Sequence, residues 1–308
     1  MIYSVFTSFF VFIVLGYLWR YIKGVPDSHM LRAAINSLVL YILLPLLTFS
    51  VIYAAPLHDE SWKIPFIAAL VTIGCIGFSV SIYVLIKRIW PDLLSDKSIG
   101  ALVLGASWCN ATYLGYPIVT GILGKQYGSI PLIYDLLALT PLLWIIGAMI
   151  AGYYSDDTSS FKQRYISGLK RILGLPPLYA LFAAILCKIV DIDIHPDILK
   201  TCSIAGNAVP PLMMISVGMA LNIPKLNSIL LILPAAIIRI AIGPLIAYGL
   251  IHVLHIQEPL SKAIMLESGM PTMVLTLVIA QEYTLDTNIL AQLIALSTLL
   301  SIISLSLI

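Results

Sequence analysis

The sequence predicts an all-helical, polytopic membrane protein, because it is strongly apolar, carries few charges and divides into long apolar runs. Of its 308 residues, 60% are hydrophobic and 10% are charged, and the mean hydropathy is +1.01. A soluble domain carries roughly 25% charged residues, so the composition excludes a soluble enzyme. The net charge of +2 provides no basic face for a nucleic acid. The lipid bilayer is therefore the expected partner.

Ten apolar runs approach or exceed the roughly 20 residues that an α-helix needs to cross a bilayer. Their uniform apolar character favours helices over barrel strands, in which lipid-facing and lumen-facing residues alternate. The connections between the runs are too short to hold a separate soluble domain. The ten predicted transmembrane helices cover residues 2–19, 32–55, 64–86, 98–123, 130–153, 173–190, 201–222, 228–254, 260–281 and 287–307.

The basic residues predict the orientation of the chain in the cell inner (plasma) membrane. By the positive-inside rule both termini face away from the cytoplasm. The first run is predicted to be a span rather than a signal peptide, since no basic residue precedes it and no small-x-small cleavage site follows it. Loops after odd-numbered spans hold Arg20, Lys23, Arg32, Lys87, Arg88, Lys97, Lys162, Arg164, Lys170, Arg171 and Lys225, whereas the other loops hold Lys63, Lys125, Lys188, Lys200 and Lys262.

The ten spans divide into two halves of five, and the hydrophilic stretch 155–171 separates them as a cytoplasmic connector. Because each half has an odd number of spans, the second half enters the membrane from the opposite side, which is the condition for an inverted repeat. Spans 2 and 7 also share a pattern, PLLTFSVIYAAP from Pro45 and PLMMISVGMALNIP from Pro211. The sequence therefore predicts two inverted five-helix repeats, residues 1–154 and 172–308.

Span 4 contains a predicted break, in the segment GASWCNATYLGYPIVTG that starts at Gly105. Asn110, Thr112 and Tyr113 are unusual in a lipid-facing helix. Pro117 removes a backbone donor, disfavours helix at the preceding residue and suits the first position of an outgoing half-helix. Irregular backbone at membrane depth must face protein or a wet cavity. The alternative is a kinked helix in which Asn110 and Thr112 bond to neighbouring helices.

Span 9 repeats this pattern as MLESGMPTMVLTLV from Met265. Ser268 or Gly269 can leave the helix, Pro271 can start the next one, and Thr272 would then lie in its first turn. Two half-helices that begin near mid-membrane direct their positive dipole ends and free N–H groups at one place, which predicts an anion site.

Three charged residues of the predicted spans, Glu267, Asp135 and Arg239, are candidates for a functional role. An intramembrane carboxyl is a candidate for ion coupling, so Glu267 and Asp135 are candidates, although the position of Asp135 near the outer end of span 5 favours a solvated end. Glu267 has a packing role as its alternative, paired with a hydroxyl or with Arg239. Arg239 suits either a substrate carboxylate or a locking contact with a carbonyl or with Glu267.

Four polar residues at corresponding places in spans 2 and 7 are candidates to line a cavity, namely Asn36, Asn207, Ser50 and Ser216. Hydrogen bonds that pack one helix on another fit Asn36 and Asn207 equally well.

No motif in the sequence predicts catalysis, a cofactor or a metal site. The four cysteines have no CxxC spacing, the five histidines lie at or near span ends without an HExxH pattern, and no GxxxxGK[ST] motif is present. A channel would repeat a filter sequence, which is absent. The remaining class is a secondary transporter.

Five segments, in order along nearly the whole chain, resemble the bacterial auxin efflux carrier family, which is related to the plant PIN carriers. These are NSLVLYILLPLLTFS (36–50), NATYLGYPI (110–118), PLMMISVGMAL (211–221), RIAIGP (239–244) and MPTMV (270–274). The resemblance implies a fold similar to the bile acid:sodium symporters and the NhaA antiporters. Spans 1, 2, 6 and 7 would form a scaffold, spans 3–5 and 8–10 would form a moving transport domain, and the carrier would be a homodimer working as an elevator.

The resemblance also implies a small organic anion as substrate, such as malate, malonate or an auxin-like carboxylate. Asn110 and Pro117 match the family's first crossover and Pro271 matches the second. Thr112 stands where the family often has glycine, and Glu267 stands at a place that is more usually small or polar. The predicted substrate-binding set is Asn110, Thr112, Tyr113, Pro117, Arg239, Met270, Pro271 and Thr272. The coupling ion is H⁺ or Na⁺, and Glu267 favours a proton because sodium requires several oxygen ligands.

Overall fold

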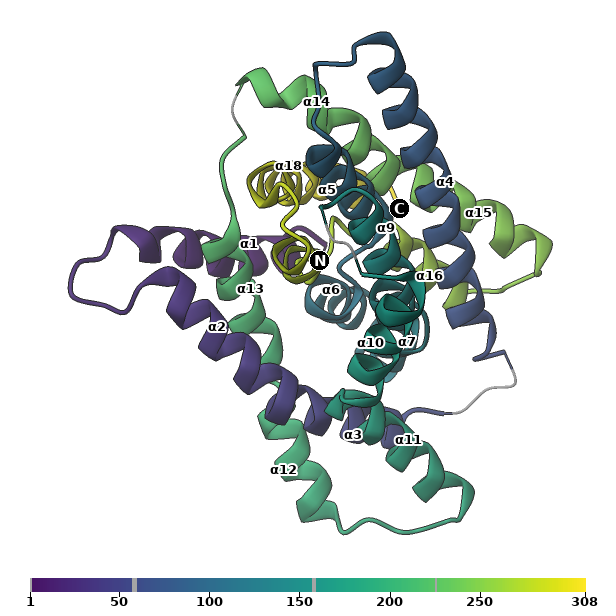
Figure 1. The fold of residues 1–308 in the computed structure, drawn as a ribbon. Helices are drawn as coiled ribbons and strands as arrows, with labels where there is room; N and C mark the ends of the chain where they lie inside the picture. Colours follow the sequence, from purple (N-terminus) through teal and green to yellow (C-terminus); the bar gives the residue numbers. More distant parts are fainter. Residues whose placement is uncertain (1, 57–59, 157–158, 225) are drawn as a thin grey trace.

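The structure is a computed structural model that describes residues 2–56, 60–156, 159–224 and 226–308, and helices dominate it (Figure 1). Six helices among these residues are long and apolar enough to cross a membrane by length and composition, or seven if the bent pair at 161–189 counts as one span. The prediction of an all-helical polytopic membrane protein is confirmed. The arrangement of ten spans in two inverted repeats stays a prediction.

The first helices closely follow the predicted apolar runs. Asp27 starts the second segment, because its carboxylate accepts hydrogen bonds from the backbone N–H groups of His29 and Met30. Ser95 caps α5 in the same way through Ser98 N–H, at 3.1 Å. Up to the first interruption the elements are α1 (Ile2–Leu18), α2 (Ser28–Leu38), a π-helical turn (Val39–Leu43), α3 (Leu44–Ala54), α4 (Lys63–Ile89) and α5 (Asp96–Ser107).

Beyond the interruption the chain re-enters helix and then forms one long, irregular helical segment. Three π-helical turns occur in this part of the chain. The elements are a π-helical turn (Ala111–Gly115), α6 (Tyr116–Leu123), a 3-10 turn (Lys125–Tyr127), α7 (Ser129–Tyr134), a π-helical turn (Asp135–Leu139), α8 (Thr140–Leu142), a π-helical turn (Leu143–Gly147) and α9 (Ala148–Tyr153).

Much of the predicted connector 155–171 is helical. Helix α10 (Phe161–Leu173) starts at a capping box, in which Ser160 and Gln163 bond reciprocally to each other's backbone N–H groups. It continues into α11 (Pro176–Ile189) through a bend of 55°. The hydrophilic composition of this stretch therefore reflects an amphipathic helix and its flanks.

The second half contains the other interruption. Its elements are α12 (Pro196–Gly206), α13 (Val209–Ala220), α14 (Leu226–Ile237), a π-helical turn (Ile238–Ile242), α15 (Gly243–Val253), α16 (Leu260–Ser268), α17 (Thr276–Glu282) and α18 (Thr287–Ser306). Residues 269–275 between α16 and α17 are not helical.

Helix packing brings the two halves of the sequence together. Helix α1 packs along α13, α3 packs against α11 and α12, and α5 packs against α4 and α18. Glycines permit the closest approach, since a Cβ atom at Gly16 would lie 2.1 Å from the carbonyl oxygen of Ile215, and one at Gly218 would lie 2.0 Å from that of Ile13. The most buried region lies where the chain interrupts α5 and α16.

Candidate functional site

The two interrupted segments cross and pair with each other through their backbones. Asn110 N–H donates to the carbonyl of Pro271 at 2.8 Å, and Met273 N–H donates to that of Trp108 at 2.9 Å. These bonds flank the antiparallel bridge between Cys109 and Thr272. We call residues 108–110 and 271–273 the crossing. Because irregular backbone away from water must find internal partners, this pairing explains how both helices can stop inside the protein.

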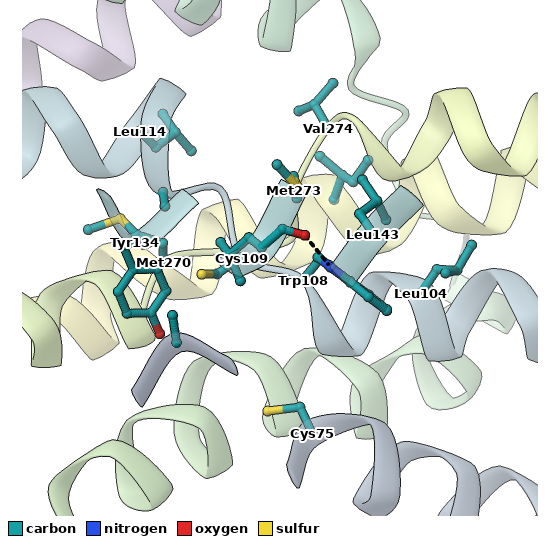
Figure 2. Close-up of a cluster of buried hydrophobic side chains, with 14 of the residues drawn as sticks. Cys75, Leu104, Trp108, Cys109, Leu114, Tyr134, Leu143, Met270, Met273 and Val274 are labelled. Atoms are coloured by element: carbon teal, nitrogen blue, oxygen red, sulfur yellow. Dashed lines mark hydrogen bonds between the residues drawn. The ribbon is translucent and has the colours of Figure 1, made fainter. Parts of the chain in front are cut away.

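Trp108 anchors the crossing from the side of α5. Its side chain is fully buried, and the indole Nε1–H donates to the carbonyl of Leu139 at 3.0 Å. Figure 2 shows this bond and the apolar side chains gathered around Trp108, Cys109 and Met273. The tight packing fixes the crossing against the long helical segment that contains Leu139.

Arg239 contacts the ends of both interrupted helices and is fully buried. Its Nη1 donates to the carbonyl of Ser107 at 2.8 Å, and its Nη2 donates to that of Ser268 at 2.6 Å. These two serines are the last residues of α5 and α16. Arg239 therefore makes the contact with carbonyl groups that was one of the sequence-based alternatives. In the described part of the chain no ion pair joins Arg239 to Glu267.

Glu267 lies in the last turn of α16, and its side chain is fully buried. Neither carboxyl oxygen has a hydrogen-bond partner among the described residues. The carboxyl group packs against Gly115, where an added Cβ would lie 2.3 Å from each oxygen. A buried carboxyl group without a partner is costly, and the packing alternative, in which Glu267 pairs with a hydroxyl or with Arg239, is not seen among the described residues.

The backbone of Asn110 forms hydrogen bonds within the protein, whereas its side-chain donor has no partner among the described residues. Its carbonyl accepts from Leu114 N–H at 3.3 Å and from Gly115 N–H at 3.1 Å, which starts the outgoing helix. The residue is 2% exposed, and its side-chain Nδ2 has no partner among the described residues. A buried donor of this kind suits a carboxylate or another acceptor.

Asp135 is buried, so the solvated end position favoured by the sequence is wrong. The helical segment starts at Lys125, earlier than the predicted limit of 130, which places Asp135 deeper in the segment. One carboxyl oxygen accepts from Thr112 Oγ1 at 2.5 Å and the other from Thr140 Oγ1 at 2.7 Å. Asp135 therefore contacts the first turn of the outgoing helix through Thr112.

Neither proline starts its half-helix where the sequence predicts. Helical residues begin at Ala111, and Pro117 lies inside that helix, behind a π-helical turn. A proline lacks the N–H group and clashes with the preceding turn, and the wider π-helical turn accommodates it. In the second half α17 begins at Thr276, so Pro271 and Thr272 lie in the crossing instead.

Both polar groups of Thr272, the hydroxyl and the backbone N–H, form hydrogen bonds within the protein. Its hydroxyl donates to the carbonyl of Gly105 at 2.8 Å, and its N–H donates to Ser297 Oγ at 3.2 Å. Met270 is fully buried beside it, whereas Tyr113 is half-buried. Thr272 thus ties the second interruption to the end of α5.

The four predicted cavity-lining residues lie away from the crossing contacts. Ser216 Oγ donates to Asn36 Oδ1 at 2.7 Å, which joins α13 to α2. Ser50 Oγ donates to the carbonyl of Leu47 within its own helix, at 3.0 Å. Asn207 is exposed. For Asn36 the structure shows the packing alternative, with Ser216 as its partner.

A cavity of about 300 Å³ adjoins the crossing through Pro271. Helix α1 forms one wall, the outgoing helix contributes Leu114 and Ile118, and α18 forms another wall. Hydroxyl groups come from Tyr17, Thr298 and Ser301, and the other lining residues are apolar, namely Phe10, Ile13, Val14, Leu114, Ile118, Leu221, Ile223, Pro224, Pro271, Ala295, Leu299 and Ile302. Of the predicted site residues, Pro271 lines this cavity.

Sequence reasoning missed two contributors to the site. Gly115 provides the space that the Glu267 carboxyl occupies. Tyr134 is fully buried, and its hydroxyl lies 3.1 Å from Ser268 Oγ at the end of α16. Gly115 could have been found because it lies within the polar segment of span 4. Tyr134 lies in an apolar run, where a tyrosine does not stand out.

The sequence is similar to one protein family and to two transporters of archaea. The sequence model of a family described as membrane transport protein matches residues 2–153 and 160–308. An uncharacterized transporter of Methanocaldococcus jannaschii is 26% identical over 304 residues, which cover 96% of this chain and 94% of that protein. An uncharacterized transporter of Methanothermobacter thermautotrophicus is 28% identical over 303 residues, covering 97% and 95% of the two chains.

Proposed function

Because the chain belongs to the membrane transport protein family, which includes the auxin efflux carriers, we propose that it is a secondary transporter of small organic anions, either auxin-like monocarboxylates or dicarboxylates. The observation that carries this proposal is the unused side-chain donor of Asn110 at the paired interruptions. A carboxylate bonded there would satisfy a buried polar atom that otherwise costs free energy.

The neighbouring cavity supports a substrate with an apolar body. Its lining is mainly hydrophobic, and it reaches the crossing at Pro271. Ligand pockets typically combine apolar walls with a few placed polar groups. In this proposal the carboxylate of the substrate meets Asn110, and its apolar part lies between α1 and α18.

We further propose elevator-type alternating access in a homodimer. The proposal assigns α1, α2, α3 and α11–α13 to the scaffold and the helices of spans 3–5 and 8–10 to the transport domain. Its support is that α1 packs along α13 and α3 packs against α11 and α12, while α5 packs against α4, α14 and α18. Both termini would face away from the cytoplasm, in the inner (plasma) membrane, with residues 155–171 on the cytoplasmic side.

Proton coupling through Glu267 completes the proposal. The Glu267 carboxyl is buried without a partner among the described residues, whereas Asp135 accepts from two threonine hydroxyls. A proton needs one group, whereas sodium needs several hard oxygen ligands, and this interruption offers only Glu267 and a few hydroxyl groups as side-chain oxygens. Because like charges repel, the substrate anion and an ionised Glu267 would compete, which favours symport of the anion with a proton.

Two measurements test the proposed function. A thermal-shift screen of the purified protein against monocarboxylates, dicarboxylates and indole acids, at several pH values and with or without sodium, reports binding, because a ligand raises apparent stability by mass action. Proteoliposomes then distinguish a carrier from an anion channel, since only a carrier shows saturable uptake with counterflow. A shift produced by sodium alone would favour a sodium-coupled carrier, and uptake without pH or sodium dependence would favour a facilitative one.

A further inference from the structure

The C-terminal ends of α5 and α16 meet at one buried arginine. Arg239 Nη1 and Nη2 donate to the terminal carbonyl groups of these two helices, at Ser107 and Ser268. The last four carbonyl groups of any helix lack partners within it, and the end of the helix carries a partial negative charge. Two such ends that face each other in the protein interior would repel, so the guanidinium satisfies both groups and offsets both charges.

Several neighbouring carbonyl groups have other donors. At the end of α5, Thr272 Oγ1 donates to Gly105 and Met273 N–H donates to Trp108. At the end of α16, Gly269 N–H and Met270 N–H serve the preceding carbonyls. Arg239 thus supplies a donor to the last carbonyl group of each helix.

We propose that Arg239 is a positioning residue, whose guanidinium joins the ends of α5 and α16 and thereby fixes the register of the crossing. Both terminal nitrogens are engaged with backbone carbonyls, whereas Nε has no hydrogen-bond partner among the described residues. The role depends on neither the substrate nor the coupling ion, and its test is therefore separate from that of the proposed function.

Gly243 leaves the space that the guanidinium of Arg239 needs to reach the end of α16. A Cβ atom at this position would lie 2.4 Å from Arg239 Nη2 and 2.9 Å from the carbonyl oxygen of Ser268. Gly243 therefore lets the guanidinium lie along its own helix and reach α16. Gly249, on the same helix, has no atom within 4 Å of an added Cβ, which makes it a matched control for the change of glycine to alanine.

A natural cysteine in the crossing makes its register measurable. Cys109 lies opposite Thr272 in the antiparallel bridge, and the flanking bonds from Asn110 and Met273 make this a non-hydrogen-bonded pair. The Cα atoms of such pairs are about 4.5 Å apart, within the range that a disulfide spans. In a Thr272→Cys background, the rate at which an added copper–phenanthroline oxidant links residues 109 and 272 reports whether the two segments stay in register.

The test compares variants in this background by mass spectrometry of the linked peptides, with thermal unfolding of the reduced protein as a second readout. We expect Arg239→Met and Gly243→Ala each to slow the linkage by about tenfold, the effect of losing a charged hydrogen bond. Arg239→Lys keeps the positive charge without the fork, so it should restore part of the rate. Gly249→Ala should leave the rate unchanged.

Linkage at the unaltered rate in Arg239→Met or in Gly243→Ala overturns the proposal. If Arg239→Met does not yield folded protein, Gly243→Ala decides the question, because it retains the arginine and displaces only its guanidinium. Equal slowing by Gly249→Ala also overturns it, since the effect would then come from any added methyl group on that helix.

Discussion

The carboxyl group of Glu267 lies directly against Gly115, so that a methyl group at residue 115 would come within 2.3 Å of both carboxyl oxygens. This contact joins the acid at the end of α16 to the first turn of the helix that leaves the other interruption. A change in the protonation of Glu267 would therefore act directly on the helix that follows Asn110. This relationship gives the proposed coupling a physical path.

The variant Glu267→Gln tests whether this acid carries the coupling proton. Glutamine has nearly the same shape but does not titrate, so we expect transport to lose its pH dependence while substrate binding is preserved. The measurement is initial uptake in proteoliposomes across a pH series, together with the thermal shift by the substrate. Transport with the pH dependence of the unaltered protein would show that Glu267 is not the carrier.

The variant Gly115→Ala keeps the acid but moves it. Because the added methyl group overlaps both oxygens of Glu267, the carboxyl must turn into a different environment, and we expect the pH midpoint of transport to shift. Gly77→Ala is the control, since a Cβ there has no atom within 4 Å. The same pH profile in Gly115→Ala and in the unaltered protein would argue against a role for this contact.

The variant Asn110→Ala tests the proposed anion site. Loss of the side-chain donor should weaken binding of a carboxylate by about 1–3 kcal/mol, the cost of leaving a buried polar partner unsatisfied. Asn207→Ala is the control, because Asn207 is exposed. Unchanged affinity in a folded Asn110→Ala protein would move the site elsewhere. The affinity is measured by titration of the thermal shift.

The variant Thr112→Val removes one of the two hydroxyl groups that donate to Asp135 without changing the volume much. We expect the loss of the 2.5 Å bond to destabilise the protein by about 1–3 kcal/mol. Thr201→Val, on an exposed position where the hydroxyl bonds only its own helix, should have little effect. Equal unfolding temperatures of Thr112→Val and the unaltered protein would contradict this prediction.

The sequence predicted where the helices stop but not what holds their ends. Polar residues and prolines in otherwise apolar runs identified the segments around Asn110 and Pro271, and the structure interrupts the helices there. The partners of Arg239 are backbone carbonyls, which every residue possesses, so no residue type could identify them. The burial of Asp135 depends on a helix that starts at Lys125, and the charge at this position suggested a loop.

Proline also misled the prediction of where the helices restart. Local preference places Pro117 at the first turn of a helix. In the structure the pairing of Asn110 with Pro271 sets the start at Ala111, and a π-helical turn then accommodates Pro117. Tertiary hydrogen bonds therefore outweighed the local preference of the proline.

Two glycines at the α1–α13 contact give a prediction about the packing of the proposed scaffold. A Cβ at Gly218 would lie 2.0 Å from the carbonyl oxygen of Ile13, which is a backbone atom and has no side-chain freedom to move away. Gly218→Ala should therefore push the helices apart and destabilise the protein by about 1–3 kcal/mol, as overpacking does in other cores.

Gly77→Ala is the control for this prediction. A Cβ at Gly77 meets no neighbouring atom within 4 Å, so the variant should leave the unfolding temperature unchanged or raise it slightly through helix propensity. Thermal unfolding in detergent measures both variants. Because Gly218 lies outside the crossing but contacts Ile13, which lines the adjoining cavity, any loss of substrate affinity should accompany the loss of stability. A loss of affinity in a variant of unchanged stability would contradict this prediction.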